Sequence, residues 1–294
     1  MPLRPYSCAN CGHWQRWFAE PPFCPVCTDV RNALPDDGWA WITPADLADR
    51  EARWAQVAPG VCGYWVDPQV GLGTTGWVIE TDAGLVGWEG AGFYPAAALA
   101  ELRRRGGLVA LGASHVHGYG ALWQLLDELA PAVLAIGVDD LQWTKAFRVT
   151  WPTDDRHELA PGLVMHRSGG HFPGHSVLHD ERRGILFVGD LLKVDLARDA
   201  DDRDVPVGLS CHKAFHAQIP LSHAEIRQAR ALVERLEFDA VATPFEFAAP
   251  VSQKQVLALF DRQLGVDEVY VQQIGPDFEG FFAAYEKDVL PALR

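Results

Sequence analysis

The stretch LVALGASHVHGYGA, residues 108–121, contains the pattern on which the interpretation of this chain depends. Its first half is apolar and reads as a buried strand, and two histidines, His115 and His117, follow in the turn after that strand. Histidines at positions i and i+2 of a turn can direct both imidazoles at one metal ion. The stretch therefore predicts part of a metal site at the end of a strand.

Two later motifs carry groups of the same kind. GGHFPGHS contains His171 and His175, and FVGDLL places Asp190 directly after an apolar run. A third histidine from a neighbouring loop completes a three-histidine site with a position left for water, and a carboxylate after a strand can bind the same ion. Because zinc lowers the pKa of bound water toward about 7, such a site favours hydrolysis at neutral pH.

The sequence around these motifs predicts a layered α/β domain. From about residue 70, short apolar runs alternate with amphipathic segments. Strands that carry titratable residues at their ends and are separated by helices place a site at one edge of a sheet. We expect strands at 74–81, 84–90, 108–115, 132–138, 163–171, 175–180, 184–190 and 239–243, and helices at 95–107, 119–129 and 222–236.

The order SHVHGYGA, GHFPGHS, FVGDLL resembles the metallo-β-lactamase superfamily over roughly residues 70–250. Members of that superfamily form a four-layer αββα sandwich with a metal site at one edge. The resemblance implies that His115 and His117 match the first two ligands of the H-x-H-x-D-H turn. It further implies that His175 matches the ligand histidine of the P-G-H motif and that Asp190 matches the metal-bridging aspartate. His171 is a further ligand candidate, with orientation of the loop as the alternative role.

The chain departs from the family pattern where a second metal ion would bind. Tyr119 and Gly120 stand where H-x-H-x-D-H has its last two ligands. The family's final histidine is missing near residue 244, where Glu246 is the nearest substitute oxygen donor, and Glu89 replaces an aspartate after an earlier strand. We therefore expect at most one zinc or iron ion in this pocket. Asp190 would orient the water, and Tyr119 would lie nearby as a hydrogen-bond donor or phenolate.

A second metal site is predicted near the N-terminus. Cys8-x2-Cys11 and Cys24-x2-Cys27 can close a tetrahedron of thiolates around Zn²⁺, and metal binding would supply folding energy to so short a segment. Rubredoxin-type iron has similar ligands, and redox cycling of a C-x2-C pair is a further alternative. We expect a structural zinc ribbon with its linker at 1–37 and a metallo-β-lactamase-like domain at 38–294.

Composition limits the partners. The chain has 25 Lys and Arg against 39 Asp and Glu, a net charge of −14, which argues against binding nucleic acid or an anionic membrane by bulk electrostatics. It contains no apolar run near the roughly 18 residues of a membrane span. The first residues also lack the apolar segment of a signal peptide. We expect a cytoplasmic protein that acts on a small molecule, and homo-oligomerisation stays open.

Two main functions remain, and a third, a regulator that uses the ribbon to touch nucleic acid, is opposed by the net charge of −14. The first is a metal-dependent hydrolase that attacks an ester, thioester, lactone, amide or phosphodiester. The second is a non-catalytic binding or regulatory protein that uses the zinc ribbon to dock a partner. The missing second-metal ligands favour the second function, and the histidines and aspartate that are present favour the first.

Overall fold

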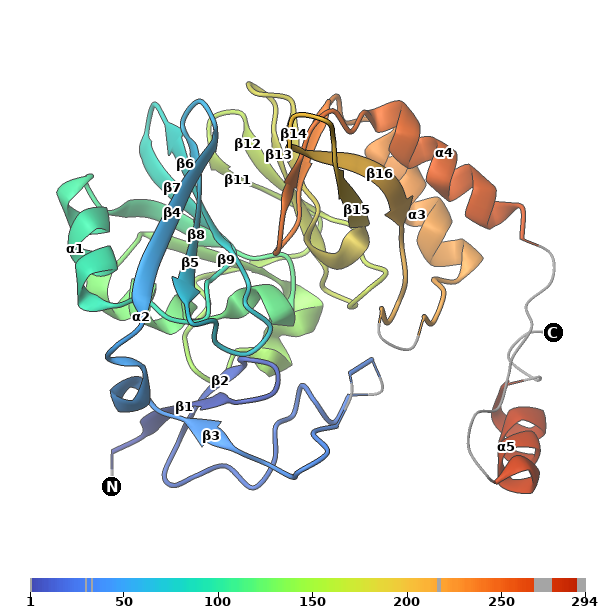
Figure 1. Cartoon of the computed structure of the whole chain (residues 1–294), viewed down its shortest axis with the longest axis horizontal. Helices are drawn as coiled ribbons and strands as arrows, with labels where there is room; N and C mark the ends of the chain where they lie inside the picture. Colours follow the sequence, from blue (N-terminus) through green and yellow to red (C-terminus); the bar gives the residue numbers. More distant parts are fainter. Residues whose placement is uncertain (1, 30, 33, 216–217, 267–276, 290–294) are drawn as a thin grey trace.

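The computed structural model describes residues 2–29, 31–32, 34–215, 218–266 and 277–289. Two β-sheets pack face to face and helices cover their outer sides, so the predicted four-layer αββα sandwich is confirmed (Figure 1). The first sheet has the order β10-β9-β8-β7-β6-β5-β4. Its strands are β4 (Glu51–Ala58), β5 (Val61–Asp67), β6 (Gly76–Thr81), β7 (Gly84–Trp88), β8 (Leu108–Gly112), β9 (Val133–Gly137) and β10 (Trp151–Thr153).

The second sheet has the order β11-β12-β13-β14-β17-β18. Most neighbouring strands within this sheet are antiparallel. The exception is the pair β14 and β17, which are parallel and are connected through a segment that includes a helix. Its strands are β11 (Arg156–Ala160), β12 (Leu163–Arg167), β13 (Ser176–Asp180), β14 (Ile185–Phe187), β17 (Ala240–Ala242) and β18 (Phe247–Ala248).

Buried apolar side chains form three layers in this fold. Between the sheets, Trp88 of β7 packs in one cluster with Met165 and Phe187 of the second sheet. The other face of the first sheet is covered by α1 (Ala96–Arg104) and α2 (Leu122–Leu129). The other face of the second sheet is covered by α3 (His223–Val233) and α4 (Gln253–Leu264). Period-two alternation in the strands and an apolar stripe on each helix account for this layering.

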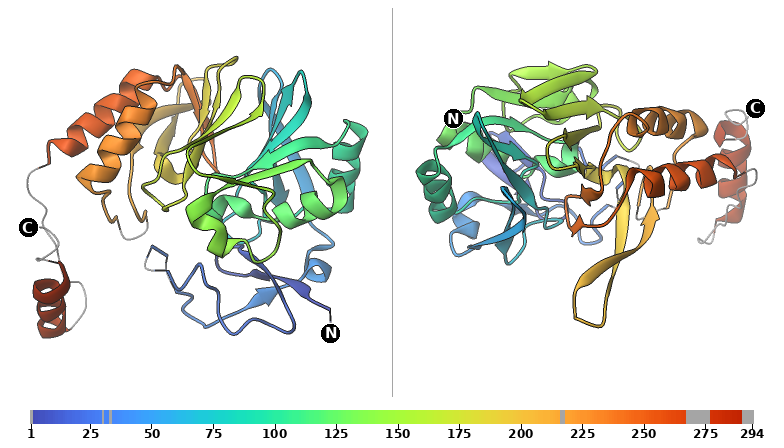
Figure 2. Two further views of the ribbon diagram at one scale, coloured as in Figure 1. Left: turned by 180° about the vertical axis from the view of Figure 1, so that it is seen from behind. Right: turned by 90° about the horizontal axis from the view of Figure 1, so that it is seen from above.

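The predicted helices lie where the sequence places them. Helix α3 begins with a capping box, in which Ser222 accepts from the Glu225 backbone N–H and the Glu225 carboxylate accepts from Ser222. The structure adds a hairpin of β15 (Lys193–Arg198) and β16 (Asp204–Ser210), which projects from the body (Figure 2). In the described part of the chain, no helix is long and apolar enough to span a membrane.

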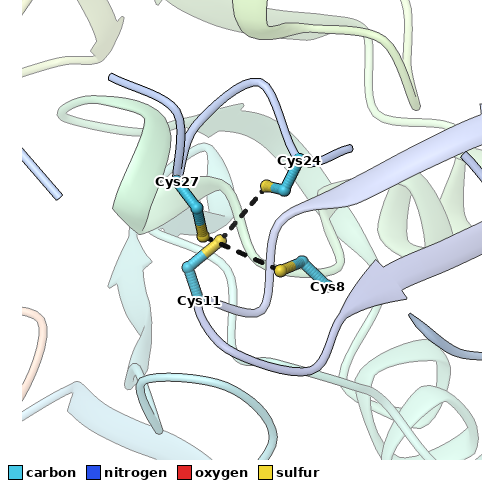
Figure 3. Close-up of side chains that lie close together, drawn as sticks. All are labelled: Cys8, Cys11, Cys24 and Cys27. Atoms are coloured by element: carbon cyan, nitrogen blue, oxygen red, sulfur yellow. Dashed lines mark hydrogen bonds between the residues drawn. The ribbon is translucent and has the colours of Figure 1, made fainter. Parts of the chain in front are cut away.

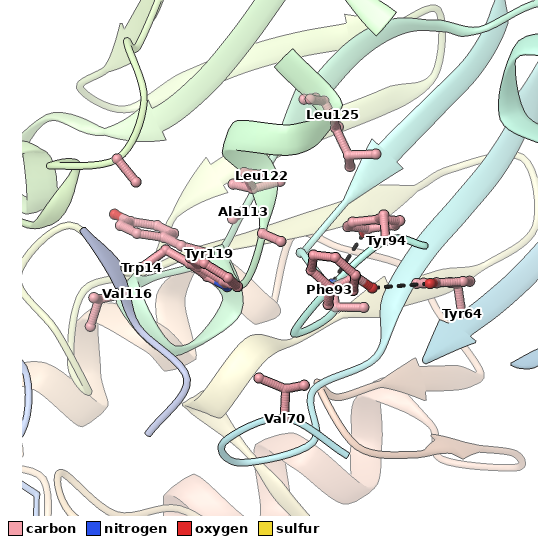
Figure 4. Close-up of a cluster of buried hydrophobic side chains, with 14 of the residues drawn as sticks. Trp14, Tyr64, Val70, Phe93, Tyr94, Ala113, Val116, Tyr119, Leu122 and Leu125 are labelled. Atoms are coloured by element: carbon pink, nitrogen blue, oxygen red, sulfur yellow. Dashed lines mark hydrogen bonds between the residues drawn. The ribbon is translucent and has the colours of Figure 1, made fainter. Parts of the chain in front are cut away.

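The N-terminal segment packs against the first sheet. Its small sheet has the order β2-β1-β3, with β1 (Arg4–Cys8), β2 (Trp14–Trp17) and β3 (Trp41–Ile42), so the pairing extends beyond residue 37. Trp14 is 1% exposed, donates its indole N–H to the Gly92 carbonyl at 2.9 Å, and contacts the rings of Phe93 and Trp123. Figure 4 shows Trp14 among side chains of the main domain. The ribbon and the first sheet therefore share one apolar core.

Candidate metal centre

Strand ends and one loop bring four metal-binding side chains together. β8 ends at Gly112, and the chain continues through His115 into a 3-10 helix (Val116–Tyr119) that carries His117. Asp190 lies in the turn after β14, and His171 comes from the loop between β12 and β13. All four side chains are buried or nearly so, with 0–10% of each side chain exposed.

The spacing of the donor atoms fits one metal ion. Asp190 Oδ2 lies 3.1 Å from His115 Nε2, 3.3 Å from His117 Nδ1 and 3.5 Å from His171 Nε2. The two nitrogens of His115 and His117 are 3.2 Å apart, and all four donors lie within 4.8 Å of one another. A tetrahedron with metal–ligand bonds of about 2.0–2.1 Å has edges of about 3.3 Å. The donor set and its spacing therefore fit zinc or a similar ion.

Hydrogen bonds outside this group orient the imidazoles. Ser114 Oγ lies 2.8 Å from His115 Nδ1, which leaves Nε2 toward Asp190. His171 Nδ1 donates to the His212 carbonyl at 3.2 Å, so its Nε2 lone pair faces the group. Such outer partners fix the ring orientation of metal-binding histidines.

Burial and the contacts within the group set the protonation states of His115, His171 and Asp190. Desolvation lowers the pKa of His115 and lowers that of His171 to about 3, so both imidazoles are neutral at pH 7. Burial alone would raise the pKa of Asp190, but the facing histidines hold it well below its usual range. Neutral imidazoles and an ionised carboxylate are the metal-binding forms.

The structure places His175 differently from the expectation that it is a direct ligand. Its Nε2 accepts from the Asp190 backbone N–H at 3.2 Å, and its Nδ1 lies 2.7 Å from Ser168 Oγ. Asp190 follows Gly189, whose φ of 53° and crowding by Ser114 exclude a side chain there. His175 thus holds the turn of Asp190 in place, and His171 takes the position beside the carboxylate.

If this arrangement is correct, two variants should differ in their affinity for the pocket metal. His171→Ala removes a donor and should weaken pocket metal binding by more than about 100-fold, whereas His175→Ala should cost about 10- to 100-fold, the range for outer partners. Zinc titration of the full chain with a competing chelator measures both affinities. A larger loss in His175→Ala would show that His175 is the ligand.

Tyr119 lies away from the expected position beside the metal. It is 1% exposed, its ring packs against Phe147 at 5.5 Å, and it does not line the cavity described below. Burial raises the pKa of its hydroxyl well above the usual range, so the phenol is neutral. Gly120 is tightly packed, because a Cβ there would lie 2.2 Å from the Gly90 carbonyl oxygen. Neither residue joins the described ligand group, so the geometry supports one ion in this pocket.

Glu89 fills the space behind the histidine turn. It is 2% exposed and accepts the Ser114 backbone N–H at 3.2 Å, and a Cβ at Gly118 would overlap its carboxyl group. Burial raises the pKa of Glu89 from 4.5 to about 8. The protonated side chain therefore supports the turn without adding a buried negative charge at neutral pH.

This pKa gives a stability difference with a defined sign. The folded state holds the Glu89 proton more tightly than the unfolded state, so its contribution is full below pH 4.5 and is lost as the pH rises to about 8. At about 1.4 kcal/mol per pH unit, the window amounts to about 5 kcal/mol. Denaturant unfolding at pH 5, 6, 7 and 8 measures this. The free energy of unfolding of Glu89→Gln should rise relative to that of the native chain as the pH increases across this range. Exposed Glu181→Gln is the control, and parallel curves for Glu89→Gln and the native chain would contradict the expectation.

Glu246 lines the cavity described below but is not one of the four clustered donors. It follows β17 in a turn held by Thr243, whose hydroxyl accepts the Glu246 backbone N–H at 3.1 Å. The turn is tied to the first sheet by Trp77, which donates to the Thr243 carbonyl at 3.1 Å. Burial raises the pKa of Glu246. His212 lies near the pocket and contributes its carbonyl oxygen as the partner of His171 Nδ1.

The four cysteines form a second cluster (Figure 3). Cys8 and Cys27 sulfurs are 3.8 Å apart, and Cys11 and Cys24 sulfurs are 3.6 Å apart. A tetrahedron with Zn–S bonds of about 2.3 Å has edges of about 3.8 Å. The cluster is consistent with the predicted zinc ribbon.

A cavity of about 480 Å³ lies between the ribbon and the four-residue group. His117, His171 and Asp190 line it, and so does Arg31 of the N-terminal segment. Arg31 donates to the His171 carbonyl at 3.1 Å and lies 3.7 Å from the centre of the Phe172 ring. Sequence reasoning missed Arg31, because no local pattern shows that two segments 140 residues apart meet.

The chain is similar to several known proteins. A model of the metallo-beta-lactamase superfamily matches residues 96–268. The uncharacterized protein YmaE of Bacillus subtilis (strain 168) is 27% identical over 255 residues, which cover 82% of this chain and 88% of that protein. The metallo-beta-lactamase FIM-1 from Pseudomonas aeruginosa, in its mono-zinc form, is similar with a TM-score of 0.54 and 14% identity, over 74% of this chain and 99% of FIM-1. DIM-1 metallo-beta-lactamase is similar with a TM-score of 0.50 and 14% identity, over 72% of this chain and 98% of DIM-1. At such identities these two structures show the shared fold.

Proposed function

Because the chain belongs to the metallo-beta-lactamase superfamily, we propose that it is a hydrolase with one catalytic metal ion, held by His115, His117, His171 and Asp190. The observation that supports this most strongly is the spacing of Asp190 Oδ2 from three imidazole nitrogens, at 3.1–3.5 Å. Three members of this group also line a cavity that a substrate can fill. The second catalytic metal of many superfamily members has no counterpart in this proposal.

Each group has a separate role in the proposed reaction. An ion bound there would supply a Lewis acid. With four protein donors, a water molecule would have to bind as a further ligand, and the ion would make that water acidic enough to act as a nucleophile near neutral pH. Asp190 carries the negative charge of the set, and its turn is held by the bond from its backbone N–H to His175. His115 and His171 stay neutral and keep lone pairs free for binding.

The donor types indicate the metal. Three imidazoles and one carboxylate suit zinc or iron in the pocket, and four thiolates suit zinc in the ribbon. We therefore propose one structural zinc and one pocket ion of zinc or iron in each chain. A cytoplasmic location and a small-molecule substrate also belong to this proposal.

Removal of the pocket ion tests the function. The full chain, loaded with zinc or iron, should hydrolyse at least one chromogenic ester, thioester, amide or phosphodiester. A chelator that empties the pocket should remove this turnover, and added metal should restore it. A folded chain with a filled pocket that hydrolyses none of these classes would contradict the proposal.

One observation favours the second candidate, a binding protein that docks a partner through the ribbon. The ribbon exposes Trp17 by 39%, Phe18 by 59% and Phe23 by 50%, and exposed aromatic residues are common at protein interfaces. However, the ribbon also packs inward through Trp14 and forms part of the cavity. Docking and hydrolysis are therefore compatible, and turnover decides whether hydrolysis occurs.

A further inference from the structure

The cavity beside the metal centre is built by two parts of the chain. On one side, the ribbon contributes Cys11 and Cys27, which belong to the four-cysteine cluster, together with Asn10, Arg31 and Asn32. These residues face the metal-binding histidines across a volume of about 480 Å³, which lies within the range of small-molecule sites. The ribbon is therefore part of the wall that a substrate would contact.

The positive charges of this cavity already have carboxylate partners. Arg31 makes two bonds to the Asp29 carboxylate, at 2.6 and 2.7 Å, and a third to the His171 carbonyl. Lys193 Nζ lies 2.7 Å from Asp195 Oδ1. An anionic substrate group would have to compete with these carboxylates.

Apolar side chains supply the other side of the cavity. Leu192 and Val194 are 1% and 5% exposed, and Phe215 lies against the His171 ring with centroids 5.5 Å apart. Leu72 and Phe245 line the same space and are 41% and 48% exposed. A ligand that covers these exposed apolar side chains removes them from water, and this burial favours binding.

We propose that this cavity binds an uncharged, apolar acyl group of an ester-type substrate, and that the ribbon forms one wall of the acyl site. The inference rests on the proposed hydrolase function, which supplies the bond that is cleaved. It adds the chemical character of the acyl group next to that bond. Because the cations of the cavity are already paired with carboxylates, the inference disfavours phosphodiesters and substrates with an anionic acyl end.

Binding of straight-chain hydroxamates tests the acyl site without turnover, because the hydroxamate head binds the pocket metal and the chain enters the cavity. Aceto-, butyro-, hexano- and octanohydroxamate should bind the metal-loaded full chain with increasing affinity. A fully buried methylene corresponds to about fourfold in affinity, and we expect at least about twofold for each. The eight-carbon hydroxamate that ends in a carboxylate should bind at least about tenfold more weakly than octanohydroxamate. Affinities that do not change with chain length, or equal binding of the carboxylate-ended probe, would overturn the inference.

Two matched phenylalanine variants locate the effect. Phe245→Ala should reduce the gain from aceto- to octanohydroxamate by at least about threefold, whereas Phe18→Ala should leave it unchanged. Phe18 is exposed by 59% on the ribbon and does not line the cavity. Both positions are exposed, and thermal melts check that each variant is folded. An unchanged gain in Phe245→Ala would also overturn the inference.

The outcomes distinguish the inference from the proposed function. If hydroxamates bind with the expected chain-length dependence and no ester, thioester, amide or phosphodiester is hydrolysed, the proposed function fails and the acyl site is supported. If esters are hydrolysed with no dependence on acyl length in either kcat/KM or hydroxamate binding, the function stands and the acyl site is refuted.

Discussion

His117→Ala is expected to abolish metal-dependent hydrolysis while the chain stays folded. The variant removes Nδ1, which lies 3.2 Å from His115 Nε2 and 3.3 Å from Asp190 Oδ2. Loss of an outer partner of a metal site costs about 10- to 100-fold, so loss of a direct donor should exceed about 100-fold in kcat/KM. The expected cost to folding is small, because His117 Nε2 has no hydrogen-bond partner among the described residues.

Steady-state kinetics, metal analysis and a thermal melt of this variant check the three parts of the expectation. His223→Ala is the matched control, because His223 is an exposed residue at the start of α3 and lies outside the ligand group. Full activity in His117→Ala would refute the proposed mechanism. Loss of activity in the control as well would show that the effect is not specific to the metal centre.

Cys24→Ser is expected to destabilise the entire chain and to lower its metal content by up to one ion. Cys24 is fully buried and belongs to the same apolar cluster as Leu99 of α1 and Leu122 of α2. Binding of structural zinc contributes about 10–16 kcal/mol to the folding of zinc-finger peptides. We expect a loss of at least about 3 kcal/mol here, which corresponds to a fall in Tm of about 6–12 °C.

Cys62→Ser is the matched control for this prediction. Cys62 lies in β5, is half-buried, and is not part of the four-cysteine cluster. Its replacement should leave the metal content unchanged and lower Tm by less than Cys24→Ser. Equal effects of the two variants would contradict a structural metal in the ribbon. Because Trp14 and the cysteines share a core with the main domain, these experiments use the full chain.

Local patterns predict many of the strands and helices, and the resemblance to the metallo-β-lactamase superfamily implies how they are layered. Apolar runs that end in His115 or Asp190 mark β8 and β14, and the helices at α1, α2 and α3 have apolar faces and, in α3, a capping box. The β15–β16 hairpin is harder to foresee. Its charged tip, Asp199–Asp204, resembles an exposed loop, and pairs such as Arg203 with Asp199 form only once the hairpin turns.

The candidate site is predicted less completely, for reasons of geometry. His171 and His175 lie four positions apart, and sequence spacing alone does not show which imidazole faces Asp190. Asp140, which is distant in the sequence, helps to set the conformation of this loop. Its carboxylate accepts the Gly174 backbone N–H at 2.9 Å. The division of the chain at residue 37 and the catalytic roles of the site residues stay predictions.

The ribbon illustrates the same limit. Its C-x2-C spacing predicts the four-sulfur cluster without knowledge of the rest of the chain. By contrast, the contact of Arg31 with His171 joins residues 140 positions apart, and burial of Trp14 depends on Gly92 and Phe93. Local chemistry indicates what each segment could bind, and long-range packing places the two candidate ligand clusters on opposite sides of one cavity.

Metal content per full-length chain tests the central claim most directly. Elemental analysis of the native chain should give two ions, and His117→Ala should reduce the count to one while the four-cysteine cluster stays filled. That result would place one ion with the four cysteines and one with His115, His117, His171 and Asp190. A native chain that holds one ion, unchanged in His117→Ala and lost in Cys24→Ser, would show that the histidine group binds no metal and would contradict the proposed hydrolase.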